Sequence, residues 1–133
     1  MLRYVVVSVF GGLLLGFLDG LINANPYAQK LFEVYKPIAK SSVNIILGFG
    51  IDILYGFVLA GLFLLLYKSL PGQTMLLKGL SFGLIVSFLS VVMHVFSQLV
   101  MFKVPANALV YMFLTGLVEM LLIGLFFGLT LKK

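Results

Sequence analysis

Four long apolar runs constrain what this chain can fold into. They cover residues 4–22, 43–67, 79–101 and 108–131. A helix needs about 20 residues to cross the hydrocarbon core of a bilayer, and each run is close to or above that length. Glycines lie inside the runs and polar residues do not alternate with apolar ones, so neither soluble strands nor a transmembrane barrel fits. The sequence therefore predicts an all-α integral membrane protein, a four-helix transmembrane bundle.

Composition indicates the same class and excludes several others. Hydrophobic residues make up 62% of the 133 residues, and charged residues make up 10%. A water-soluble domain of this size could not cover its surface with so few polar groups. The nine Lys and Arg residues are scattered, with no run longer than the pair Lys132-Lys133, so no basic block is long enough to follow a phosphate backbone. We therefore expect a single membrane domain, residues 1–133, embedded in a lipid bilayer and without a nucleic-acid partner.

The longest connection between the predicted helices, residues 23–42, has a pattern of its own. Tyr27, Leu31, Tyr35 and Ile38 recur at helical spacing, while Lys and Glu residues lie between them. This pattern is typical of an amphipathic helix that lies in the membrane interface. We therefore expect a short interfacial amphipathic helix over residues 27–40, between the first and second transmembrane helices.

The N-terminal run and the distribution of charge bear on topology. Arg3 before an apolar stretch is compatible with a signal peptide, but the run is long for one and ends at Asp19-Gly20, so we expect a retained helix. Five Lys and Arg residues lie on the side of the two termini, and four lie on the other side. Because cytoplasmic loops carry the excess of positive charge, we expect both termini in the cytoplasm and the bundle in the plasma (inner) membrane.

Glycines spaced by four residues lie on three of the predicted helices. This spacing makes a flat face on which another backbone can approach closely. The face is suited to packing inside the bundle, and contact with another subunit is the alternative. The candidate helix-packing residues are Gly12, Gly16, Gly20, Gly79, Gly83, Gly124 and Gly128.

Each predicted helix also carries one ionisable side chain. These residues are Asp19, Asp52, His94 and Glu119. A charge at the bilayer centre costs about 2.5–3.5 kcal/mol on insertion scales, so such residues normally face a partner or a cavity. We predict that Asp52, His94 and Glu119 point into the bundle and form a polar core, whereas Asp19 lies nearer its helix end and is able to reach the headgroups. Residues at spacings of three or four share these helix faces, and the further candidates for the polar core are Gln98, Tyr55, Ser90, Thr115 and Asn44.

The polar core has several interpretations. It can hold the bundle together by hydrogen bonds, conduct protons or cations, or bind a quinone, a lipid or another amphiphile. One His and no Cys form a poor ligand set, so we expect no metal and no cofactor. No nucleophile–base pair is set by the spacing and no phosphate-binding loop is present, so we expect no catalytic residue and no enzymatic activity.

These observations favour a small non-catalytic membrane protein. We expect an accessory or scaffold subunit of a larger membrane complex, or a bundle that self-associates as a homo-oligomer. The alternative is a small transporter or channel that moves protons, cations or a small solute through the polar core, and the third is a quinone- or lipid-binding subunit. A scaffold should hold its carboxyl groups paired and dry, whereas a transporter needs a water-accessible cavity that reaches Glu119 or Asp52.

Overall fold

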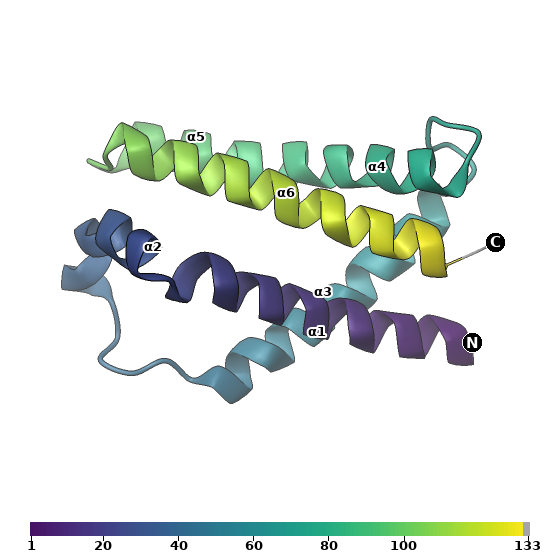
Figure 1. Cartoon of the computed structure of the whole chain (residues 1–133), viewed down its shortest axis with the longest axis horizontal. Coiled ribbons are helices and arrows are strands. Elements are labelled where there is room, and N and C mark those ends of the chain that lie inside the picture. Colours follow the sequence, from purple (N-terminus) through teal and green to yellow (C-terminus); the bar gives the residue numbers. More distant parts are fainter. Residues whose placement is uncertain (132–133) are drawn as a thin grey trace.

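A computed structural model describes residues 1–131, and within that range the chain forms helices and short connections with no strand (Figure 1). The third apolar run is not a single α-helix, because a π-helical segment divides it. The elements are α1 (Leu2–Ala24), α2 (Pro26–Leu31), the 3-10 helix η1 (Phe32–Ile38), α3 (Ile45–Leu66), α4 (Met75–Val86), the π-helix η2 (Ser87–Val92), α5 (Met93–Met101) and α6 (Ala106–Thr130).

Four helices are long and apolar enough to cross a membrane. They are α1, α3, the continuous stretch Met75–Met101 and α6. The predicted all-α four-helix transmembrane bundle is therefore confirmed. The third helix begins four residues earlier than predicted, because the Thr74 hydroxyl caps it by accepting a hydrogen bond from the Leu77 N–H at 3.2 Å.

The connection between α1 and α3 was predicted as one interfacial helix and forms two shorter ones. The Asn25 side chain caps α2 by accepting from the Ala28 N–H at 2.8 Å, and Pro26 occupies the first turn. An α-helix cannot continue through Pro37, which has no N–H to donate, and η1 ends one residue later. Tyr27 and Phe32 stack edge-on against Tyr111 of α6, at ring distances of 5.6 and 5.8 Å. We call α2 and η1 together the interfacial segment, and these rings hold it against the bundle.

The four transmembrane helices form two closely packed pairs. In the pair α1 and α3, a Cβ on Gly12 would lie 2.8 Å from the Asp52 carbonyl oxygen, and a Cβ on Gly56 would lie 2.6 Å from the Gly12 nitrogen. In the pair α4 and α6, a Cβ on Gly83 would lie 2.7 Å from the Met120 carbonyl oxygen. Gly79, Gly124 and Gly128 meet backbone atoms in the same way. Glycine is therefore required at both crossings, because the backbones touch.

Two of the candidate packing glycines behave differently. A Cβ on Gly16 would meet the Phe49 ring, a side chain that is able to move, at 2.5 Å. Nothing lies within 4 Å of a Cβ built on Gly20, so Gly20 makes no packing contact inside the bundle. Figure 1 shows the reason, since α3 crosses α1 and then diverges from it toward Ile45.

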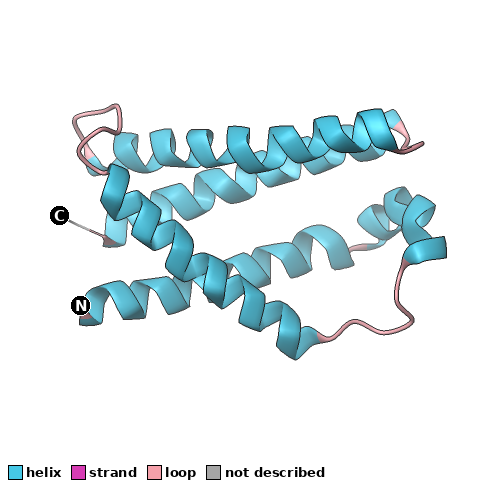
Figure 2. Ribbon diagram, turned by 180° about the vertical axis from the view of Figure 1, so that it is seen from behind, coloured by secondary structure: helices cyan, strands magenta, loops and turns pink. Residues whose placement is uncertain are grey.

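The apolar core lies toward the end of the bundle that holds both termini. Phe63, Phe82 and Phe127 come from α3, α4 and α6, are fully buried and stack at ring distances of 5.3 to 6.3 Å. At the same end the Arg3 Nε donates to the Thr130 carbonyl at 2.7 Å. Toward the other end α3 splays away from the bundle (Figure 2), and Ile46 is 87% exposed. The bundle is therefore closed at the terminal end and open at the opposite end.

The glycine contacts give a first prediction. Gly83→Leu should destabilise the bundle by about 1–3 kcal/mol or more, because the new side chain would push apart two backbones that are in contact. Thermal unfolding in mild detergent measures this effect. Gly20→Leu is the matched control and should change the unfolding temperature little, because its Cβ points into open space. Equal losses for the two variants would show that the α4–α6 contact is not as tight as described.

Candidate functional site

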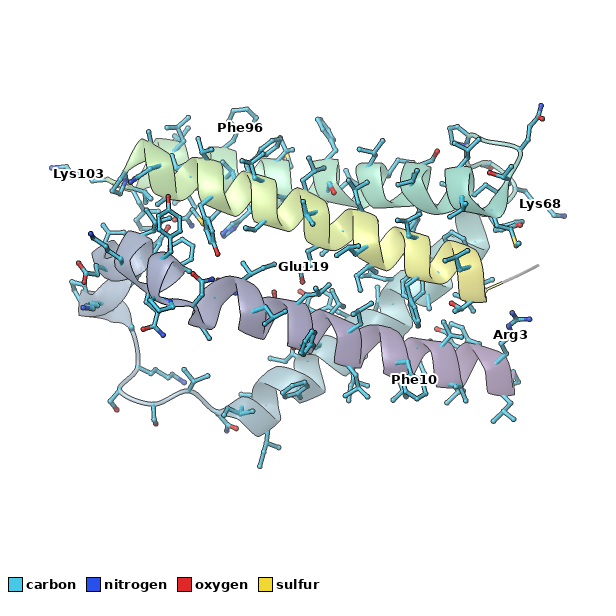
Figure 3. The ribbon with its side chains drawn as sticks, in the orientation of Figure 1. Arg3, Phe10, Lys68, Phe96, Lys103 and Glu119 are labelled. Carbon is cyan, nitrogen blue, oxygen red and sulfur yellow. The ribbon has the colours of Figure 1, made fainter. Side chains whose placement is uncertain are left out.

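Three carboxyl groups from three helices meet near the middle of the bundle. Asp19 of α1, Asp52 of α3 and Glu119 of α6 line one cavity of about 270 Å³. The carboxyl groups of Asp19 and Glu119 lie within hydrogen-bonding reach of each other, and Asp52 is close enough to act on Glu119 electrostatically. Glu119 is 7% exposed, and Figure 3 shows it between α6 and α1. The three acids therefore form a single cluster.

The glycine contacts of α1 position two of these acids. The crossing at Gly12 brings the backbone of α3 against α1 at Asp52. One turn further along α1, a Cβ on Gly16 would lie 3.0 Å from the Asp52 Oδ2 atom, so this carboxylate packs against bare backbone. Asp19 follows three residues later on the same helix face. The close approach of the two helices thus places the carboxylate of Asp52 beside that of Asp19.

A second cavity of about 300 Å³ adjoins the first. The two share Asp19, Ser90 and Glu119, and the second adds His94 of α5 and Thr115 of α6. We call the two cavities together the polar cleft. One end of the polar cleft lies at Asn23 and Phe32, where α1 gives way to the interfacial segment, and the other end lies at Leu15 and Leu59, which belong to the apolar core. The walls of the polar cleft are Asp19, Asn23, Phe32, Asp52, Tyr55, Val86, Ser90, His94, Met112, Thr115, Glu119 and Met120, among others.

A π-helix faces the carboxyl cluster. Within η2, the Ser87 hydroxyl donates to the Gly83 carbonyl at 2.7 Å and is buried, whereas Ser90 lines both cavities. The Ser90 hydroxyl donates to the Val86 carbonyl at 2.6 Å. Serines that bond back to the preceding turn often bend a helix, and π-helical turns occur frequently at functional sites. Sequence reasoning missed this segment, and the two serines spaced by three residues are the one signal that points to it.

The structure places the predicted polar residues in two groups. Asp52, His94, Glu119, Tyr55, Ser90 and Thr115 line the polar cleft. Asn44 does not, because it caps α3 by accepting from the Leu47 N–H at 3.0 Å, at the far end of the splayed helix. Gln98 lies outside as well, and its Oε1 accepts a hydrogen bond from the Tyr35 hydroxyl at 2.6 Å. Burial raises the pKa of the Tyr35 hydroxyl, which therefore stays protonated and joins η1 to α5.

Asp19 occupies a more central place than its sequence position suggested. The predicted helix ended at residue 22, whereas α1 continues to Ala24. At 1.5 Å per residue the two additional residues place Asp19 about 3 Å deeper. It lines both cavities of the polar cleft and bonds to Glu119, so it does not reach out toward the headgroups.

No positive charge balances the carboxyl cluster within the described residues. Neither cavity is lined by Lys or Arg, and the ion pair found in residues 1–131 joins Lys36 to Glu33 at 3.3 Å in the exposed interfacial segment. In the same part of the chain no three His, Asp or Glu side chains are arranged to hold a metal ion. A hydrogen bond between two carboxyl groups requires a proton on one of them. The cluster is therefore suited to binding a proton or a cation.

The polar cleft gives a second prediction, which uses the absence of Cys from the sequence. Ser90→Cys should react with a water-soluble maleimide in liposomes, because the thiolate forms only where water enters. The matched controls are Ser87→Cys and Leu89→Cys. Ser87 is 2% exposed, and Leu89 is 66% exposed on the lipid-facing side of η2. Both should react at least about tenfold more slowly, since burial or lipid suppresses the thiolate. A Ser90→Cys rate as low as that of Leu89→Cys would mean that the cleft is dry.

Comparisons with models of known protein families, with curated proteins and with solved structures found no match. We therefore infer function from the chemistry and geometry of the described residues.

Proposed function

We propose that this chain is a small membrane carrier that exchanges protons for a cation at the carboxyl cluster. The observation that carries the proposal is the adjacent pair of carboxyl groups of Asp19 and Glu119, which line the same cavities and have no positively charged partner among the described residues. Ionisable groups inside a membrane are costly, and those that persist generally serve ion or proton pathways.

The shape of the polar cleft supports a carrier more than an open channel. The cleft begins at Asn23 and Phe32, on the side of the bundle opposite to the termini. It ends at Leu15 and Leu59, beyond which the rings of the apolar core close the bundle. A cleft that is open toward one side and closed toward the other matches one state of an alternating-access cycle.

The exchange needs no chemistry beyond proton transfer. The Asp19–Glu119 pair holds one proton between its two carboxyl groups. When a cation binds between the two carboxylates, the proton leaves the pair and passes into the cleft. His94 lines the same cavity as both acids and is able to accept that proton. Asp52 adds a third negative charge that favours the cation.

The hypothesis of an accessory subunit is supported by a different observation. The beginning of α3 is unpartnered on opposite faces, since a Cβ added to Gly48 or to Gly50, two residues apart, would have no neighbouring atom within 4 Å. Small residues on a lipid-facing helix favour contact with another helix. We therefore keep self-association, or association with a neighbouring membrane subunit, as the second candidate. The mass of the particle purified in mild detergent shows whether further chains are bound. The cavities that reach Glu119 and Asp52 favour the carrier.

The third prediction tests the carrier. In liposomes that contain the protein and an internal pH dye, an inward gradient of a monovalent organic cation such as tetramethylammonium should raise the internal pH. Glu119→Gln should slow this response by about tenfold or more, because the amide carries no negative charge to bind the cation and no acidic proton to exchange for it. Glu33→Gln, an exposed acid paired with Lys36, is the matched control and should behave like the unchanged protein. An undiminished response in Glu119→Gln would contradict the proposal.

The fourth prediction concerns orientation in the membrane. We propose the plasma (inner) membrane, with both termini in the cytoplasm and the polar cleft open to the outside. Figure 3 places Arg3 and Lys68 at one end of the bundle and Lys103 at the other, and the sequence-based count of five Lys and Arg residues on the side of the termini against four on the other side favours a cytoplasmic location for the termini. Reporter fusions at residue 133 and within residues 30–40 should give opposite signals, with the cytoplasmic signal at residue 133. The same signal at both sites would contradict four crossings, and reversed signals would contradict the orientation.

A further inference from the structure

An apolar groove on the outside of the bundle also leads to Glu119. It lies between α1 and α6 and has a volume of about 350 Å³. Its walls are almost entirely aliphatic, with Leu18, Leu21, Leu114, Val118 and Leu122 among them, and Glu119 is its one acidic residue. We call it the lateral groove.

The lateral groove opens toward lipid. Only residues of α1 and α6 line it, while α3 packs on α1 and α4 packs on α6. Figure 1 shows α1 and α6 nearest the viewer, with α3, α4 and α5 behind them. Leu21, Leu114 and Val118 are exposed on this face. In a bilayer these side chains contact hydrocarbon, so a ligand enters the lateral groove from the membrane rather than from water.

Glu119 therefore lies where the lateral groove and the polar cleft meet. It is more than nine-tenths buried, lines both cavities of the cleft as well as the groove, and has another carboxyl group as its polar partner. An apolar groove that contains one carboxyl group without a positive partner is complementary to a molecule with an apolar body and one positive charge.

We propose that the cation exchanged at the carboxyl cluster is an alkylammonium, whose hydrocarbon chain occupies the lateral groove while its head lies at Glu119. This proposal rests on the carrier function proposed above. From Glu119 the lateral groove extends along α6 as far as Tyr111, about 12 Å at 1.5 Å per residue. That length fits a linear chain. Since no three acidic or His side chains in residues 1–131 are arranged for a metal ion, an organic cation fits the cluster better than a bare divalent one.

The experiment measures proton release when a cation binds to the full chain in lipid nanodiscs. Decyltrimethylammonium and tetramethylammonium are the probes, because they share a head and differ in the alkyl chain. Both keep their charge at any pH, so neither carries protons itself. Empty nanodiscs correct for partitioning into lipid. In the unchanged protein, decyltrimethylammonium should release protons at a concentration at least about tenfold lower than tetramethylammonium does, since burial of each methylene favours binding.

Variants that fill the lateral groove separate its role from that of the carboxyl cluster. Leu114→Phe and Val118→Phe should weaken the response to decyltrimethylammonium about tenfold and leave the response to tetramethylammonium unchanged. Val110→Phe is the matched control, because Val110 is 56% exposed on α6 and does not line the groove. Glu119→Gln should abolish both responses. Two groove variants are used so that a folding defect in one, seen as a lowered unfolding temperature, leaves the other informative.

The outcomes distinguish the two proposals. One outcome is that tetramethylammonium releases protons through Glu119, while neither the alkyl chain of the probe nor the groove variants change the concentration required. The carrier function then stands and the alkylammonium proposal is overturned. A lipid chain would in that case be the occupant of the groove. If neither cation releases protons from the unchanged protein, the carrier function fails and the alkylammonium fails with it. Equal weakening of both probes by the groove variants and by Val110→Phe would likewise contradict a specific role for the groove.

Discussion

The contact between glycine backbones at two helix crossings is the interaction on which the rest of the structure depends. Lipid is as apolar as a leucine side chain, so transmembrane helices gain little by burying apolar surface against each other and associate instead by close packing. Gly12 meets α3 and Gly79 meets α6 at backbone distance. Both contacts lie in the middle of the helices or toward the terminal end, where the rings of Phe63, Phe82 and Phe127 fill the core. Beyond the crossings α3 diverges, and the space that it leaves is where the carboxyl groups lie.

The carboxyl cluster differs from Lys78, a charged side chain that is paired with polar groups of the same chain. Lys78, at the beginning of the third transmembrane helix, donates to the carbonyls of Tyr67 and Leu70 at 2.7 and 3.1 Å and lies 4.8 Å from the centre of the Tyr67 ring. Its charge is matched to carbonyls just beyond the end of α3, as expected for a group that only stabilises the fold. Glu119 is buried, Asp19 and Asp52 are half-buried, and the three carboxyl groups face one another and a cavity. An acidic cluster in that position costs stability, which is why we assign it a function.

Much of the fold could be predicted because run length and helical spacing are local properties. The four crossings follow from the length of the apolar runs, and six of the seven glycines expected at contacts do meet other atoms. Spacing shows which face of a helix a residue occupies but not how far the neighbouring helix follows that face, so it did not show that Gly20 lacks a contact within the bundle. Gly56, which has no other glycine at a spacing of four, was missed. Asn44 shares a face with Asp52 yet serves as a helix cap, because its position at the helix end decides its partner. The π-helix at Ser87–Val92 depends on tertiary packing and left only a faint local signal.

The position of Glu119 determines how a proton and a cation would be coupled. One carboxyl group lies at the meeting point of the polar cleft, which leads toward water, and of the lateral groove, which opens toward lipid. Under the proposed exchange the proton and the alkylammonium occupy the same carboxyl pair, so each lowers the affinity of the other by the same factor. Coupling then needs no signal between distant sites and arises from competition at one place. Under the same proposal the two ligands use different routes, the proton by way of His94 and the cleft, and the hydrocarbon chain by way of Val118 and the groove. That separation would allow a single acid to serve an aqueous and a lipid-facing opening in a chain of only 133 residues.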